Sequence, residues 1–180
     1  MPSILPGEHA GAVLSHYRAD LERLQGVIKV KDGSPYEEQI EVQADSWQRV
    51  RHLKHLLEDR LEGTPVKISA PYDKCGTLVP EKNSGSAEEI RAEFAEDISA
   101  LPGVIGVKAE THKVSYPEKP WVLSTWQDVL VIETVTGQRA QELDNLIENT
   151  IKGVPVAISV LELRPVNPDI SFPDDTSLFP

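Results

Sequence analysis

Apolar residues recur at helical spacing in two pairs of segments. The first stripe is Val13, Tyr17, Leu21 and Leu24, and 77 positions later it returns as Ile90, Phe94, Ile98 and Leu101. A second block repeats at an offset of 90, where Val50, Leu53, Leu57 and Leu61 return as Ala140, Leu143, Ile147 and Ile151. Apolar residues three to four positions apart mark one face of a helix. Two offsets held over so many positions predict an internal duplication.

Each copy has the pattern β-α-β-β-α-β. In the first copy we predict strands near 3–5, 27–31, 38–44 and 65–70 and helices over 10–24 and 46–62. In the second copy we predict strands near 77–79, 104–110, 127–135 and 154–163 and helices over 87–100 and 138–151. Ser86 with Glu89, and Asp45 with Gln48, have the spacing of a capping box at a helix start. Gly63 and Gly153 are predicted to close the helices before them.

This element order resembles the ferredoxin-like superfold. The resemblance implies an α+β protein of two fused ferredoxin-like units, with antiparallel sheets and helices on one face of each sheet. The predicted copies span 1–72 and 73–164, and an extended or disordered acidic tail spans 165–180. The phrases Leu101-Pro-Gly-Val-Ile-Gly-Val107 and Gly153-Val-Pro-Val-Ala-Ile158 also resemble small α+β modules found beside bacterial trypsin-like proteases. Neither resemblance names a function, because one fold serves many.

The copies differ most between their second and third predicted strands. The offset rises there from 77 to 90, so the second copy carries 13 extra residues within 110–127. This insertion contains Tyr116, Trp121 and Trp126. Long loops that bear aromatic residues are common binding elements, because a rigid ring buries much area at little entropic cost. Two interpretations remain open: a surface that contacts a partner or ligand, and a lid folded back on the sheet or helices.

The second copy also has strands that are apolar on both faces. Polar and apolar residues alternate over 40–43 in the first copy, but residues 129–132 in the second are all apolar. A sheet with helices on one face leaves the other exposed, so we expect the face bearing Val129, Val131 and Leu161 to be covered. The insertion, the first copy or a second subunit could cover it.

Composition narrows the class of protein. The chain of 180 residues has a net charge of −11, which argues against a nucleic-acid partner. It has no apolar run long enough to span a membrane and no segment like a signal peptide, so we expect no membrane association. A single cysteine, Cys75, cannot form a disulfide within the chain and suggests a cytoplasmic protein. The predicted second helix of the first copy is locally basic, and an acidic partner could dock there.

No motif for catalysis emerges. His52, His55 and Asp59 form the best metal-like cluster, but their spacing is not that of a zinc hydrolase. Cys75 has no base at a fixed spacing, and His112 has only Glu110 and Glu118 nearby in sequence. We therefore predict no catalytic residues, no metal and no cofactor, and we lean against an enzyme.

The leading hypothesis is a non-catalytic protein-interaction or regulatory binding module that acts through the second copy. Its predicted contact residues are Tyr116, Trp121, Trp126, Val129, Val131 and Leu161, and its partner is another protein or a second copy of the chain. The alternative is a small-molecule sensor or small enzyme with a pocket between the copies. A weaker alternative is a protease-directed inhibitor or regulatory module that inserts its C-terminal tail into a partner.

Overall fold

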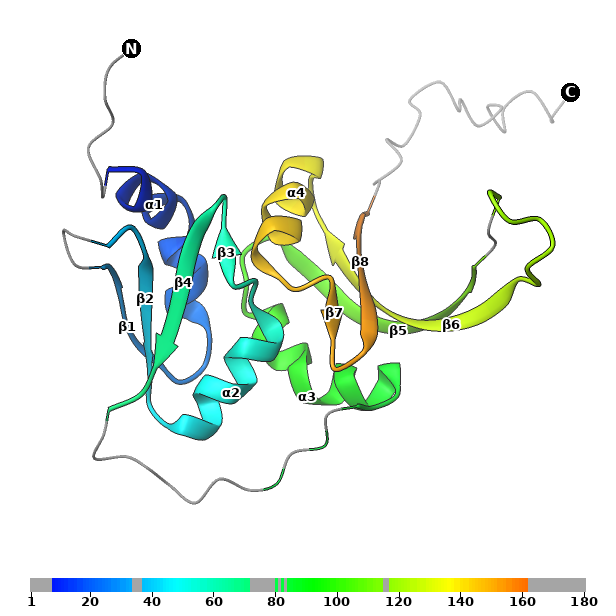
Figure 1. Cartoon of the computed structure of the whole chain (residues 1–180), viewed down its shortest axis with the longest axis horizontal. Coiled ribbons are helices and arrows are strands. Elements are labelled where there is room, and N and C mark those ends of the chain that lie inside the picture. Colours follow the sequence, from blue (N-terminus) through cyan, green and yellow to red (C-terminus); the bar gives the residue numbers. More distant parts are fainter. Residues whose placement is uncertain are drawn as a thin grey trace, which may run out of the picture.

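The computed structural model describes residues 8–33, 37–71, 80, 82, 84–114 and 117–161. Over these residues the protein is α+β, with four helices and two four-stranded sheets (Figure 1). The first half contains α1 (Glu8–Arg23), β1 (Val27–Asp32), β2 (Ile40–Ala44), α2 (Trp47–Leu56), β3 (Arg60–Leu61) and β4 (Thr64–Ser69). The second half contains α3 (Ala87–Ser99), β5 (Val104–Val114), β6 (Thr125–Thr134), α4 (Gly137–Leu146), β7 (Thr150–Ile151) and β8 (Val154–Val160). The predicted strands at 3–5 and 77–79, and the tail 165–180, lie outside the described residues.

Both sheets are mixed, which corrects the prediction of antiparallel sheets. The strand orders are β1-β2-β4-β3 and β5-β6-β8-β7, and the central pairs β2–β4 and β6–β8 are parallel. In the ferredoxin-like split βαβ arrangement, a further strand separates the two strands joined by a helix. Here β2 and β4 are joined through α2 and are hydrogen-bonded directly. Each half therefore contains an unsplit βαβ crossover, flanked by a hairpin partner on one side and a two-residue strand on the other.

Two predicted helices end earlier than the apolar stripe suggested. α2 stops at Leu56 and α4 at Leu146, and the next residues, Leu57 and Ile147, adopt extended backbone. These two residues form an antiparallel bridge across the halves. The Glu58 N–H donates to the Leu146 carbonyl (3.0 Å), and the Glu148 N–H donates to the Leu56 carbonyl (2.9 Å). The apolar pattern extends beyond each helix because Leu57 and Ile147 are still buried after the helix has ended, in the bridge between the halves.

The local signals at the helix ends were partly misplaced. The Ser86 capping box is present, with both reciprocal hydrogen bonds formed. In α2, however, the cap is Ser46 rather than Asp45, and its hydroxyl accepts from the Arg49 N–H (3.2 Å). Gly63 and Gly153 do not close helices but lie in the β3–β4 and β7–β8 turns, at φ of 84° and 83°. Their left-handed backbone suits glycine in a tight turn as well as it suits a helix end.

The halves meet through their helices, and each sheet lies on the outer side of its own helices (Figure 1). One continuous core joins them, and it includes Tyr17 of α1 and Phe94 of α3. The Tyr17 hydroxyl accepts from the Asn145 side-chain amide of α4 (3.4 Å). At the second contact between the halves, the Phe94 ring of α3 stacks on the His52 ring of α2, with ring centres 4.3 Å apart. α1 therefore packs near α4, and α3 packs on α2.

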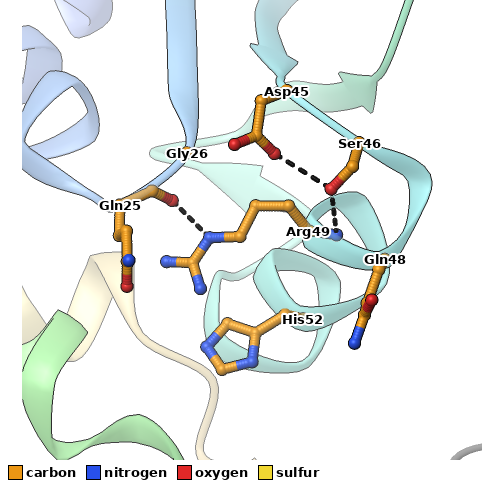
Figure 2. A pocket seen from close by; sticks show the side chains of 7 residues that line it. All are labelled: Gln25, Gly26, Asp45, Ser46, Gln48, Arg49 and His52. Atoms are coloured by element: carbon orange, nitrogen blue, oxygen red, sulfur yellow. Dashed lines mark hydrogen bonds between the residues drawn. The ribbon is translucent and has the colours of Figure 1, made fainter. Parts of the chain in front are cut away.

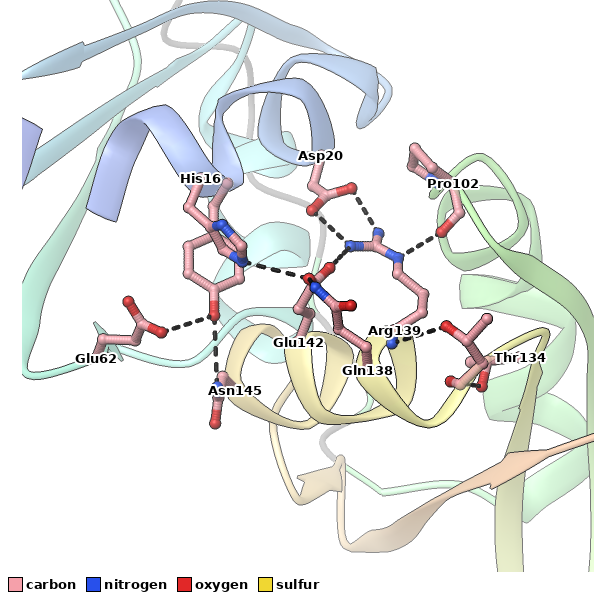
Figure 3. Close-up of polar contacts among 11 residues, drawn as sticks. His16, Asp20, Glu62, Pro102, Thr134, Gln138, Arg139, Glu142 and Asn145 are labelled. Carbon is pink, nitrogen blue, oxygen red and sulfur yellow. Dashed lines mark hydrogen bonds and ion pairs between the residues drawn. The ribbon is translucent and has the colours of Figure 1, made fainter. Parts of the chain in front are cut away.

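Two buried arginine–aspartate pairs clamp this interface, and each is the counterpart of the other. Arg139 donates to both carboxylate oxygens of Asp20 (2.6 and 3.0 Å) and, through Nε, to the Pro102 carbonyl (2.5 Å), as Figure 3 shows. At the matching positions, Arg49 donates to Asp97 and to the Gln25 carbonyl. Each arginine thus bonds a carbonyl of its own half and the carboxylate of the other. A bidentate guanidinium–carboxylate pair fixes both distance and orientation.

Two further pairs at the interface each join a histidine of the first half to a glutamate of the second half. His16 lies 3.4 Å from a carboxylate oxygen of Glu142, and the matching pair is Glu93 with His52 (3.8 Å). At each of these two positions the first half has a histidine and the second half a glutamate. Two first halves would therefore face histidine with histidine, and two second halves would face glutamate with glutamate. The interface is complementary between unlike halves and not between like ones.

We predict that Asp97→Asn destabilises the protein by about 3 kcal/mol, because it leaves the largely buried Arg49 charge without its carboxylate. Chemical denaturation at pH 7 measures the effect. Glu88→Gln is the control: Glu88 pairs with Arg91 on the exposed surface of the same helix, so its midpoint should not move measurably. A midpoint for Asp97→Asn equal to that of the control would contradict a stabilising clamp.

The same carboxylate gives the clamp a pH dependence. Burial raises the pKa of Asp97, but hydrogen bonds from His52 and Arg49 outweigh it and hold that pKa below its usual value. Its stabilisation is therefore complete above the ordinary aspartate pKa of about 3.9, and it is lost as the pH falls through the lower, folded-state pKa. Unfolding measured from pH 6 to pH 2 should show this acid-dependent loss in the parent chain and a smaller one in Asp97→Asn.

Candidate functional site

The second half carries a two-stranded arm. β5 and β6 pair in continuous register from Gly106–Glu133 to Val114–Thr125. Beyond the helices they continue together, away from the rest of the molecule (Figure 1). The 13 extra residues thus mainly lengthen a hairpin, and strand structure occupies 110–114 and 125–127 of the inserted region. The arm forms because β5 and β6 remain hydrogen-bonded beyond the part of the sheet that the helices cover (Figure 1).

Polar cross-strand pairs line the outer part of this arm. The Thr111 hydroxyl donates to Asp128 on the opposite strand (2.9 Å). His112 and Glu110 lie 2.8 Å apart on one strand, and both are exposed. His112, which the sequence offers no strong reason to call catalytic, thus lies in a surface pair rather than in a cavity. Ladder hydrogen bonds and these pairs, more than apolar burial, hold the outer arm in shape.

Large apolar side chains at the end of the arm are open to solvent. Trp121, Leu123 and Trp126 are 77%, 86% and 71% exposed. Single exposed apolar residues are ordinary, but two indoles and a leucine within six positions are not. These fractions do not fit a lid folded back on the sheet, which would bury the rings. The exposed group Trp121, Leu123 and Trp126 is called the arm tip below.

The other predicted contact residues lie elsewhere. Val129 and Val131 are 7% and 6% exposed, on the central strand β6. Their neighbours across the ladder are Glu110, Lys108 and Ala157, and Lys108 also bonds Glu133 (2.7 Å). Long side chains on the flanking strands thus cover much of this face. Leu161 follows β8 and is 41% exposed, and Tyr116 lies outside the described residues.

A polar hollow of 270 Å³ lies where α2 begins, beside the interface. Figure 2 shows it, lined by Gln25, Gly26, Asp45, Ser46, Gln48, Arg49 and His52. Its basic groups are already engaged, because Arg49 bonds Asp97 and Gln25, and His52 Nε2 lies 2.8 Å from Asp97. The Ser46 hydroxyl caps the helix and bonds Asp45. This arrangement braces the two halves and positions no nucleophile against His52.

His52 and Asp59, two members of the most metal-like group in the sequence, do not lie together. His52 is turned into the interface against Phe94 and Asp97, whereas Asp59 is exposed beyond the end of the helix. Across the part of the chain that the structure describes, no group of three or more histidine, cysteine, aspartate or glutamate side chains is placed to hold a metal ion.

Sequence reasoning missed an acidic group at the bridge between the halves. Burial, followed by the charges of Asp59 and Asp144, raises the pKa of Glu58. Burial, followed by the charges of Glu58 and Asp59, raises the pKa of Glu148. Glu58 and Glu148 are matched at the offset of 90, so the duplication places them on opposite sides of one bridge. The repeat signal was available, but only the tertiary structure shows that these residues meet.

No family model, curated protein or solved structure matches this chain. Among the described residues, no helix is both long and apolar enough to cross a bilayer.

Neutralising the acidic bridge should stabilise the protein. We expect Glu148→Gln to raise the free energy of unfolding at pH 7 by about 0.5–1 kcal/mol, because the neutral amide avoids the cost of burying a carboxylate and its repulsion by Glu58 and Asp59. A raised folded-state pKa penalises the charged form fully above that pKa, so the gain should shrink as the pH falls through it and be gone below the ordinary glutamate value of about 4.3. Glu118→Gln is the control, because it removes the same single negative charge from an exposed residue. A gain that is independent of pH would contradict this cause.

Burial separates the two kinds of predicted contact residue. We expect Val131→Ala to destabilise by about 1.5–2 kcal/mol, since it removes two buried methyl groups. Trp121→Ala should change stability by less than ~0.5 kcal/mol, because the ring is mostly exposed. Denaturation curves of the two variants test this, and a large loss for Trp121→Ala would indicate that the indole is packed in solution.

Proposed function

We propose that the protein is a non-catalytic protein-interaction module and that the arm tip is its contact surface. The single observation that carries this is the exposure of Trp121, Leu123 and Trp126 at the end of a projecting, hydrogen-bonded arm. Aromatic side chains are enriched among residues that dominate binding energy, and an arm fixed by its ladder presents them at low entropic cost.

The chemistry of the arm tip defines the kind of partner. Its members bury large apolar area only when a complementary pocket or groove receives them. Beside them lie Lys113, which pairs with Trp126 across the ladder, and the exposed residues Glu118 and Lys119. Charges of both signs next to an apolar centre fit a protein surface with an apolar core and a polar rim. The partner is therefore a folded protein with an apolar cleft. The single cysteine of this chain supports a reducing compartment such as the cytoplasm.

The small-molecule alternative has less support. It requires the polar sheet face of one copy to oppose the apolar face of the other. The halves instead meet through helices, and the sheets lie on opposite outer sides. The protease-directed alternative rests on the tail, which lies outside the described residues.

The double variant Trp121→Ala/Trp126→Ala tests the proposal. We expect at least tenfold weaker partner binding with an unchanged unfolding midpoint, because the lost area is buried only in the complex. A photo-crosslinking residue at position 123 in the host cell identifies the partner and should give one defined adduct. Binding of that purified partner is then measured for parent and variant.

Position 29 supplies the control, since Lys29 is exposed on the outer face of the first sheet, away from the arm. A crosslinker there should not give the same adduct. Equal adducts from both positions, no adduct from position 123, or undiminished affinity of the double variant would each refute the proposal.

A further inference from the structure

The first half has an exposed strand edge. The Val66 N–H donates to the Asp59 carbonyl (2.8 Å), on the side of β4 away from β2. Backbone groups of alternate residues point to the same side of a strand, so those of Ile68 also point outward. On that side β3 pairs with Thr64 and Pro65, and in the described chain no strand continues alongside Ile68. An edge of this kind is a template for another strand, and proteins commonly cover it.

A hollow of 650 Å³ runs along this edge. It is lined by Gln39, Trp47, Lys54, Val66, Lys67, Ile68, Ser69 and Ala70. Trp47 of α2 is partly buried and packs against the core, which leaves part of its indole as an apolar wall. Lys54 and Lys67 are exposed at the hollow, and they give it a positive charge in a chain whose net charge is −11. The hollow therefore offers backbone hydrogen bonds, an aromatic wall and two cations.

The second half, which has the same fold, lacks this combination. Gly137 replaces Trp47, Asp144 replaces Lys54 and Ala157 replaces Lys67 at the matched positions. An acidic segment would meet a carboxylate at Asp144 and no aromatic wall. The two copies thus share the strand edge and differ in the side chains that would recognise an occupant.

The chain itself contains a segment with the complementary chemistry. After Arg164 there are three acidic residues, Asp169, Asp174 and Asp175, and no basic residue. Ile170 and Phe172 alternate with Ser171, which is the pattern of a strand with one apolar face. Eight residues lead from Leu161 to Asp169 and thirteen lead to Asp174, and they span about 26 Å and 43 Å when extended. A compact chain of this length has a radius of gyration of ~16 Å, so a tether of this length is comparable with the size of the molecule.

We propose that the open edge of β4 and the hollow beside Trp47 bind the acidic C-terminal segment, residues 165–180, of the same chain. The segment adds alongside Ile68 as an extended strand, an apolar side chain packs on Trp47, and its carboxylates lie near Lys54 and Lys67. This function is separate from that of the arm tip and would survive if the arm bound nothing.

Trp47 fluorescence reports on the proposed contact in the full chain. The changes Trp121→Phe and Trp126→Phe leave Trp47 as the single tryptophan. We expect acrylamide quenching of Trp47 to increase at least twofold when Lys54→Glu/Lys67→Glu is added. The tail variant Asp169→Asn/Asp174→Asn/Asp175→Asn should give the same increase, and it changes no residue of 8–161. Lys29→Glu/Lys113→Glu, which makes an equal charge change at exposed lysines elsewhere, should give none.

Two further measurements make the assignment specific. Replacing Asp169 and Asp174 by lysine in the Lys54→Glu/Lys67→Glu chain should restore low quenching, since it reverses both charges of each contact. Amide exchange at Ile68 should be at least tenfold slower in the parent than in the tail variant, because the added strand protects that N–H.

Unchanged quenching and exchange in the tail variant would overturn the proposal. Protection that rises with protein concentration between 1 and 100 µM would show that the segment comes from a second chain, and would overturn its assignment to the same chain. If Lys54→Glu/Lys67→Glu fails to fold, the tail variant and the exchange of Ile68 still decide. None of these outcomes depends on partner binding by the arm tip.

Discussion

The structure depends on how two halves of one chain bury charge against each other. Asp97 is 3% exposed, and its carboxylate is acceptable there because Arg49 and His52 both bond it. Arg139 and Asp20 repeat the arrangement across the interface. A buried ion pair adds little stability over an apolar pair, but it is costly to break or misalign. The paired clamps therefore fix one relative orientation of the halves, and that orientation turns both sheets outward and lets the arm project.

The matching topology of the two halves explains why these contacts come in pairs, and their sequences show where the pairs differ. Residues matched at the two offsets meet in equivalent places, as Leu57 meets Ile147. The pairs His16–Glu142 and His52–Glu93 break this equivalence, because in both pairs the first half supplies the histidine and the second half supplies the glutamate. Two separate copies of either half would place like side chains together at these positions. The differences between the halves therefore favour contact between two unlike halves of one chain. The outer surfaces differ as well: the second half carries an exposed arm, and the first half carries a strand edge flanked by lysines.

Much of the local structure was predictable, and the errors share one cause. Periodicity placed the helices at α1 and α3 and the strands of the two parallel pairs within a few residues. It extended α2 and α4 too far, because Leu57 and Leu61 remain buried after the helix has ended. A pattern of apolar residues shows which residues are buried. It continues unchanged where the chain leaves a helix and remains buried in an extended bridge. The parallel pairing of β2 with β4 was missed because alternation along a strand does not identify its neighbour.

By itself, the sequence determined the α+β class and the position of the inserted aromatic residues, since these follow from spacing and composition. It also predicted an internal repeat, and the two halves share one strand order in the structure. Tertiary structure alone decided that Trp121 and Trp126 are exposed while Val129 and Val131 are covered. It also turned His52 inward, away from the expected polar surface and onto Asp97. The physical reason is that exposure depends on what the rest of the chain packs against a residue. Periodicity reports which residues share a face, and it does not report what that face meets.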